Sequence, residues 1–214
     1  DVRAYGKYEV PTFVWNASQS SIEVFRQNPK KYSNWFMMLG PEKEWGNAYF
    51  NLIKGLPVKF SNNKVAIITS DDAWGLGIAE GIEANAIRYG WEVSMKEVVP
   101  YGTREWGPIL TKIRRLKPAY IQLEIMGLAE CKTFLSQFKK SPTNSILHFG
   151  YETAVPDFAL NLGNEANGII GTGMPLMIPQ KVNSQSKAWL MRYKEKFGQD
   201  PVGGSYSNYI ALMW

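Results

Sequence analysis

From Lys64 onward, segments whose apolar residues have the pattern of a β-strand alternate with segments whose apolar residues have the period of an α-helix. Val65-Ala66-Ile67-Ile68 is a short β-rich apolar run between polar residues, which is typical of a buried parallel strand. Apolar residues then recur at the spacing of one helix face, at Ile78, Ile82 and Ala86. Trp91–Met95 alternates again with the period of a strand. The pattern therefore predicts a strand, a helix and a second strand in succession.

The same rhythm continues for most of the chain. It predicts further helices at 106–116, 131–138, 155–162 and 189–197, and further strands at 119–123, 146–149 and 168–171. Another helix carries Trp45, Tyr49, Leu52 and Ile53. Two proline-containing segments, Met38–Pro41 and Met174–Pro179, interrupt the rhythm and are predicted to be extended connectors, because proline fixes φ and lacks a donor. The fold class is therefore α/β, with a mostly parallel sheet flanked by helices.

Composition narrows the class of protein further. With 214 residues, 45% hydrophobic and 20% charged, the chain is predicted to fold and to bury a sizeable core. No apolar run reaches the roughly 20 residues that cross a bilayer. The net charge of +5 is mild, so nucleic acid is not expected as a partner. One Cys and one His exclude an internal disulfide and a Cys/His zinc cluster, and no cofactor or metal is expected.

Two residues stand where open α/β sheets bind their ligands, at the carboxyl ends of predicted strands. Trp74 follows the acidic turn Asp71-Asp72, and Glu152 follows the strand at 146–149. Each has a structural alternative. Trp74 can fold back over the following helix, Glu152 can be a solvated loop carboxylate, and Asp72 can cap the helix. These alternatives stay open at the level of the sequence.

Enzymatic signatures are weak. Gly75-Leu76-Gly77-Ile78-Ala79-Glu80-Gly81 resembles a dinucleotide-binding turn, but its last glycine is one residue late and Glu80 would face the pyrophosphate. Cys131 lies on an apolar helix stripe and His148 within an apolar strand, so both are predicted to be structural. Asp71-Asp72 could mimic a phosphorylated receiver domain, but the strand at 120–124 lacks the required Asp. We therefore expect no catalysis.

A series of motifs resembles the solute-binding proteins of branched-chain amino acid ABC transporters, the type I periplasmic binding proteins. The likeness is carried by the order and spacing of Pro11–Ser18, Asp71-Asp72-Ala73-Trp74-Gly75, Gly102–Trp106, Leu116–Ala119, Phe149–Glu152, Tyr193–Gly198 and Pro201. It implies two Rossmann-like lobes with parallel sheets flanked by helices. Residues 1–40 would be part of lobe I, 41–178 would form lobe II, and 179–214 would return to lobe I. Lobe I would be incomplete, which predicts that the chain is a fragment.

The resemblance also implies a function and a site. The function is the extracytoplasmic ligand-binding subunit of an ABC importer, which closes its cleft on an amino acid or a related small molecule and docks on a membrane permease. The implied site residues are Ala17, Ser18, Gln19, Trp74, Met126, Gly127 and Glu152. In the family, the position of Glu152 holds the ligand's ammonium. Gln19 departs from the family's hydroxyl residue at the carboxylate end, and Met126-Gly127 replaces an aromatic residue.

The Met126-Gly127 departure, together with Trp74, predicts a ligand that is bulkier or more apolar than leucine. The location implied is periplasmic or extracellular, with lipid anchoring through a segment outside this chain. Two alternatives of function remain: a sensory or regulatory ligand-binding domain of the same fold, and a Rossmann-like nucleotide-dependent enzyme.

Overall fold

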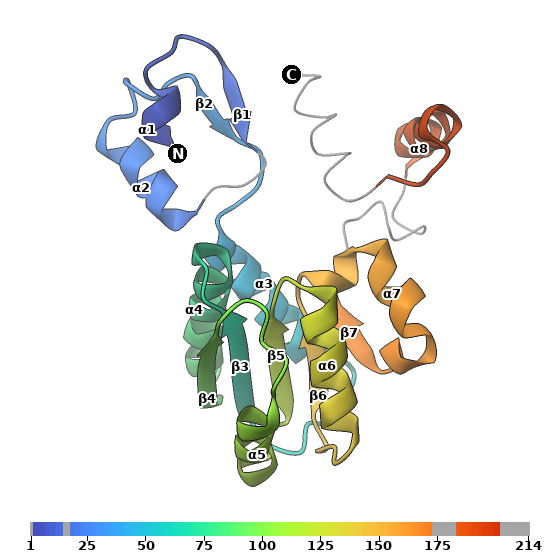
Figure 1. The fold of residues 1–214 in the computed structure, drawn as a ribbon. Helices are drawn as coiled ribbons and strands as arrows, with labels where there is room; N and C mark the ends of the chain where they lie inside the picture. Colours follow the sequence, from blue (N-terminus) through green and yellow to red (C-terminus); the bar gives the residue numbers. More distant parts are fainter. Residues whose placement is uncertain (1, 15–17, 173–182, 202–214) are drawn as a thin grey trace. The chain divides into compact units, whose positions relative to one another are not determined.

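The chain divides into two compact units. The computed structural model describes residues 2–14, 18–172 and 183–201. Residues 41–153 and 157–172 form one unit, here called the sheet unit; residues 1–40, 154–156 and 173–214 form the other (Figure 1). The assignment of residues 1–40, 41–178 and 179–214 to two lobes stays a prediction. Within the described ranges, no helix combines the length and apolar character that a bilayer crossing requires.

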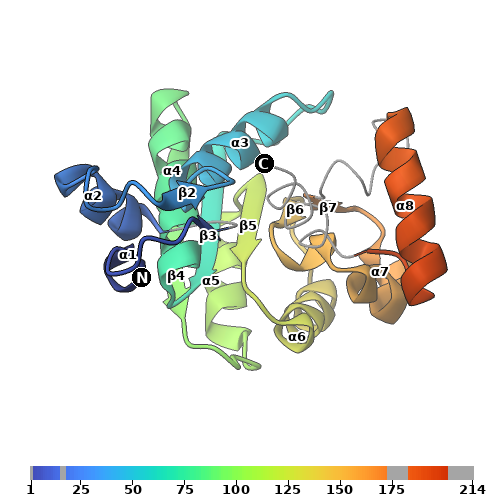
Figure 2. The ribbon, with the colours of Figure 1, turned by 90° about the horizontal axis from the view of Figure 1, so that it is seen from above.

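The sheet unit contains a five-stranded parallel sheet in the order β4-β3-β5-β6-β7 (Figure 2). Its strands are β3 (Lys64–Ser70), β4 (Glu92–Val99), β5 (Tyr120–Glu124), β6 (Ile146–Phe149) and β7 (Ile169–Gly171). Its helices are α3 (Glu42–Lys54), α4 (Ala73–Arg88), α5 (Gly107–Leu116), α6 (Leu128–Lys139) and α7 (Pro156–Leu162), with 3₁₀ turns η1 (Glu152–Ala154) and η2 (Gly163–Ala166). The predicted α/β fold class is confirmed.

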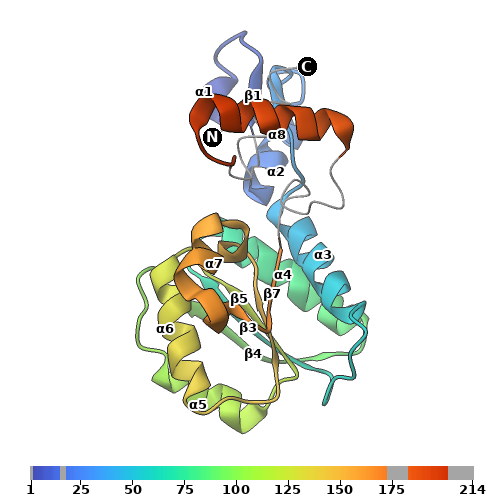
Figure 3. The same cartoon turned by 90° about the vertical axis from the view of Figure 1, so that its right-hand side faces the viewer.

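Helices cover both faces of the sheet, as the alternation of strands and helices requires. Helices α5 and α6 lie on one side and α3 and α4 on the other (Figure 3). The two sides bury separate apolar clusters. The first includes Ile68, Leu110, Ile121 and Phe134, and the second includes Phe50, Ile53, Ile67 and Ile82. Because β3 contributes to both clusters, every residue from Val65 to Ser70 is buried.

The glycine series after β3 serves helix packing. A Cβ on Gly77 would lie 1.9 Å from the side chain of Glu42, and one on Gly81 would lie 2.1 Å from the carbonyl oxygen of Lys43. Both neighbours belong to the start of α3, so α4 approaches α3 more closely than any larger residue would allow. This packing gives Gly77 and Gly81 a structural role without a nucleotide.

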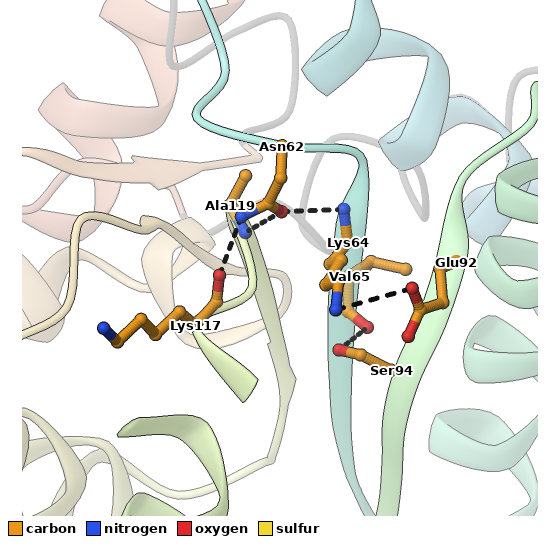
Figure 4. A network of polar contacts seen from close by, with 7 residues as sticks. All are labelled: Asn62, Lys64, Val65, Glu92, Ser94, Lys117 and Ala119. Carbon is orange, nitrogen blue, oxygen red and sulfur yellow. Dashed lines mark hydrogen bonds and ion pairs between the residues drawn. The ribbon is translucent and has the colours of Figure 1, made fainter. Parts of the chain in front are cut away.

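At the amino ends of the strands, the side chain of Asn62 joins two segments that are far apart in sequence. Its Oδ1 accepts hydrogen bonds from the backbone N–H groups of Lys64 (2.9 Å) and Ala119 (3.1 Å), and its Nδ2 donates to the carbonyl of Lys117 (2.9 Å) (Figure 4). Lys117 has a positive φ of 49°. Asn62 thus fixes the starts of β3 and β5 at the end of the sheet opposite the candidate site.

The described elements of the second unit are α1 (Val2–Tyr5), β1 (Thr12–Val14), α2 (Gln19–Gln27), β2 (Trp35–Met37) and α8 (Ser184–Phe197). Strands β1 and β2 pair in parallel. Buried residues of α1, α2 and β2, with Tyr32 between them, form a third apolar cluster, which contains Val2, Ile22, Val24, Tyr32 and Trp35. The predicted helix at 189–197 is confirmed but starts earlier, because Asn183 caps it at the N-terminus. The predicted connector Met174–Pro179 lies outside the described residues.

Candidate functional site

The turn after β3 is organised by Asp72. Its Oδ1 accepts the N–H of Gly75 at 2.9 Å, which caps α4 as expected. Its Oδ2 accepts the hydroxyl of Ser70 at 2.5 Å and the phenol of Tyr101 at 3.2 Å. Because Tyr101 follows β4, Asp72 connects the carboxyl ends of two neighbouring strands.

A second carboxylate connects the next pair of loops. Glu130, which is 9% exposed, lies in the first turn of α6 and accepts the N–H of Gly102 at 3.1 Å. A Cβ on Gly127, the N-cap residue just before this helix, would lie 2.3 Å from a carboxylate oxygen of Glu130. Glycine is therefore required at position 127 for Glu130 to keep its place.

Glu152 lies in the same series of loops. It starts the 3₁₀ turn after β6 and is only 8% exposed, so the alternative of a solvated loop carboxylate is wrong. Burial raises the pKa of the Glu152 carboxyl, a hydrogen bond from the backbone of Gly127 lowers that pKa, and the charge of Glu130 raises it. The structure thus brings together two of the predicted site residues, Gly127 and Glu152.

Trp74 lies in the first turn of α4 and is half-buried against the second apolar cluster. Its ring centroid is 6.0 Å from that of Trp45, which in turn is 6.2 Å from that of Tyr49. Trp74 therefore ends a row of aromatic rings that leads into the core. Packing on the core and contact with a ligand are both compatible with half-burial, so its role in binding stays a prediction. Met126, which is also half-buried, stays a predicted site residue as well.

The predicted residues of the second unit have local partners. The hydroxyl of Ser18 caps α2 by accepting the N–H of Ser21 at 3.4 Å, and it lies 2.7 Å from the hydroxyl of Ser20. The amide of Gln19 donates to Glu23 at 3.3 Å. Ala17 lies outside the described residues. The part of Ser18 and Gln19 in ligand binding stays a prediction.

A buried polar row, which the sequence analysis did not identify, runs under the strand ends. Tyr120, Gln122 and Glu124 project from one face of β5, and His148 on β6 pairs with Gln122 in register. The phenol of Tyr120 lies 3.0 Å from Nδ1 of His148 and donates to Oε1 of Gln122. The amide of Gln122 donates to Oε2 of Glu124 at 2.9 Å. The available sequence signal was the period of two among polar residues in a buried strand.

Burial sets the protonation states of this row. Burial raises the pKa of Glu124, the hydrogen bond from Gln122 lowers it and the charge of Asp72 raises it, and together they bring this pKa to about 8. Burial also lowers the pKa of His148 to about 4. Both side chains are therefore predominantly uncharged at neutral pH, which is the form that a buried polar group without a counter-charge adopts.

The two residues considered for nucleophilic chemistry are structural. Cys131 is buried in the first apolar cluster, and burial raises the pKa of its thiol far from the reactive range. The ring of His148 packs edge-on against Tyr49, with centroids 5.0 Å apart. In the ranges that the structure describes, no group of three or more His, Cys, Asp or Glu side chains is placed to hold a metal ion.

A parallel sheet with polar loops gathered at its carboxyl ends defines a Rossmann-like unit, a class of fold in which ligands are bound at this end of the sheet. The comparison with protein families then assigns the chain. The profile described as "Periplasmic binding protein" matches residues 3–214, and the chain belongs to this family. Its fold is the type I periplasmic binding protein fold, which confirms the resemblance found in the sequence. Among curated protein sequences, none matches this chain.

Solved structures agree with this assignment. One is a Silicibacter pomeroyi protein that carries the provisional name branched-chain amino acid ABC transporter, with 26% identity, a TM-score of 0.87, and coverage of 99% of this chain and 54% of that one. Another is an R. palustris ABC transporter solute-binding protein in complex with benzoate, with 18% identity, a TM-score of 0.76, and coverage of 98% of this chain and 55% of that one. A third is a leucine-binding protein from Thermotoga maritima, with 17% identity, a TM-score of 0.67, and coverage of 84% of this chain and 50% of that one.

The chain thus spans about half the length of the structures that it matches. The family and the fold are those of solute-binding proteins and not of enzymes.

Proposed function

We propose that this protein is the extracytoplasmic ligand-binding subunit of an ABC importer and that it binds a small molecule with an amino group. One observation carries the proposal: the loops after β3, β4, β5 and β6 are joined by hydrogen bonds at one end of the sheet, and Glu152 is buried among them. The family and its solved members support a solute as the ligand.

The charge of the strand-end loops supports a cationic group on that solute. Asp72, Glu130 and Glu152 place three carboxyl groups at this end of the sheet, in or beside these loops, and a buried carboxylate is costly unless a cation meets it. An ammonium beside Glu152 would satisfy that requirement through a charge-assisted hydrogen bond. The solved relatives include a protein bound to benzoate, so an aromatic acid is the competing ligand class to be tested.

In this proposal, Trp74 and Met126 provide apolar contacts, and Gly127 positions Glu152 through its backbone. Ala17, Ser18 and Gln19 contribute from the other lobe, which closes on the solute by a hinge motion before the protein docks on a membrane permease. A half-buried Trp and an unbranched Met suit a solute with a bulkier apolar part than leucine.

Calorimetric titration with matched pairs of probes tests the proposal. The pairs are L-leucine with 4-methyl-2-oxopentanoate and L-phenylalanine with phenylpyruvate, and benzoate serves as the aromatic acid. We expect at least one amino acid to bind about ten- to a hundredfold more tightly than its keto acid, because a hydrogen bond to a charged group contributes about 1.5–3 kcal/mol. Tighter binding of benzoate than of every amino acid would contradict the proposed ligand class. Binding of none of the five probes would contradict the proposed solute site.

A further inference from the structure

The carboxyl group of Glu124 lies wholly inside the protein, at the end of β5. Its Oε2 accepts the amide of Gln122, whereas its Oε1 has no hydrogen-bond partner within the described part of the chain. The carbonyl oxygen of the same residue lies 3.4 Å from the hydroxyl of Ser70, which also binds Asp72. Glu124 is thus connected to the strand-end loops, yet no role has been given to its side chain.

The side chain of Glu124 fills the space in front of Gly150. A Cβ on Gly150 would lie 1.9 Å from Oε2 and 2.9 Å from Oε1 of Glu124. Gly150 directly follows β6 and begins the segment Gly150–Thr153, which contains Glu152. The start of this segment therefore rests on the carboxyl group of Glu124, and no larger residue fits there while Glu124 keeps its position.

Threonine hydroxyls hold the other side of the segment. Thr172 donates to the carbonyl of Gly150 at 2.5 Å, and Thr153 donates to the carbonyl of Phe149 at 2.7 Å. The N–H of Thr172 in turn donates to Thr153 at 3.2 Å. With these bonds fixed, a change in the charge or hydration of Glu124 acts directly on Gly150.

Among the residues that the structure describes, no positively charged group interacts with the carboxyl group of Glu124. The titratable groups that interact with it electrostatically are neutral or acidic: Tyr49 from α3, Asp72 after β3, Tyr120 on β5 and Cys131 from α6. His148 on β6 reaches the row through Tyr120 and is predominantly uncharged at neutral pH. An ionised Glu124 would therefore be a buried charge without a counter-ion, which draws in water or displaces its neighbours.

We infer that Glu124 is a positioning residue for the solute site: in its protonated form it supports Gly150 and so holds the segment Gly150–Thr153, with Glu152, in the binding position. The expected effect on solute binding rests on the proposed function. The support of the segment Gly150–Thr153 by Glu124 does not depend on that function. Loss of the proton loosens the segment. Solute binding through Glu152 then weakens at alkaline pH.

Hydrogen–deuterium exchange of the unliganded protein tests the inference without any solute. Protection of residues 150–153, corrected for the intrinsic exchange rate at each pH, should fall about tenfold between pH 7 and pH 9. That factor follows because one pH unit above a pKa of about 8 leaves roughly one tenth of the carboxyl groups protonated. Glu124→Gln keeps the shape and the neutral state, so its protection should not change with pH. Glu92→Gln, at the amino end of the sheet, is the matched control and should behave like the wild type.

Retention of the wild-type pH dependence by Glu124→Gln would overturn the inference, as would constant protection in the wild type. If Glu124→Gln fails to fold, NMR titration of the Glu124 carboxyl carbon in the wild-type protein decides: an apparent pKa above 7 supports the inference and any lower value contradicts it. Because neither readout involves a solute, failure here is distinguishable from failure of the calorimetric titrations.

Discussion

Glu152→Gln is expected to change stability and solute binding in opposite directions. In the unliganded protein, Glu152 is 8% exposed and its charge is opposed by burial and by Glu130. A glutamine keeps the acceptor for the Gly127 backbone and removes the charge. The free energy of unfolding should therefore rise slightly, because burial and the charge of Glu130 disfavour the ionised form of the wild-type residue.

Binding of an amine should show the reverse. The substitution removes the partner of the ammonium while keeping its shape, and loss of one member of a buried charge pair costs about 2–4 kcal/mol, or roughly 30- to 1000-fold in affinity. Binding of the corresponding keto acid should hardly change. Calorimetry with both probes and urea denaturation of both proteins measure the two effects, and Glu92→Gln serves as the charge-matched control.

Two results would refute this reasoning. A lower free energy of unfolding for unliganded Glu152→Gln would mean that the carboxylate has a stabilising partner within the protein. Equal losses of affinity for the amino acid and for its keto acid would mean that Glu152 shapes the site without binding an ammonium.

The remaining predictions concern three further parts of the sheet unit. Trp74→Ala should weaken solute binding by roughly 1–3 kcal/mol, as loss of an aromatic anchor does, and calorimetry showing unchanged affinity would return Trp74 to a packing role. Relative to Glu124→Gln, the wild-type protein should lose stability as the pH rises from 4.5 to about 8, by at most about 1.4 kcal/mol per pH unit, because the folded state binds a proton that the unfolded state has released. Urea titrations at several pH values measure this difference, and a constant difference would disprove it. Asn62→Ala should lower the free energy of unfolding by about 1–3 kcal/mol, because it leaves polar backbone groups at the starts of β3 and β5 without a partner. The same variant should keep its solute affinity, and a large loss of affinity would contradict the placement of the site at the opposite end.

Most of the fold could be predicted from local patterns. The strand at 146–149 and the helices that carry Ile82, Leu110 and Phe134 lie where the apolar periods placed them. Capping by Asp72 was also considered in advance, since it depends on residues only three apart. Strand β4 continues to Val99, beyond the predicted end at Met95, because its backbone pairs with β3 as far as Ser70 although the polar and apolar residues no longer alternate.

The site could be predicted only in part. Local signals placed Trp74 and Glu152 at strand ends, but the links from Tyr101 to Asp72 and from Gly102 to Glu130 join loops that are about 30 residues apart. No local pattern indicates such pairs. The buried row of Tyr120, Gln122 and His148 likewise depends on the register between β5 and β6, which a single sequence does not reveal.

The central claim is that the strand-end loops of the sheet unit bind an amine-bearing solute. NMR spectroscopy of the backbone amides during titration with an equimolar mixture of the twenty protein amino acids tests it most directly. We expect the amide signals of Gly75, Gly127 and Thr153 to shift, and those of Asn62 and Ser94 at the amino ends of the strands to stay unchanged. Shifts confined to the amino ends, or no shifts at all, would contradict it.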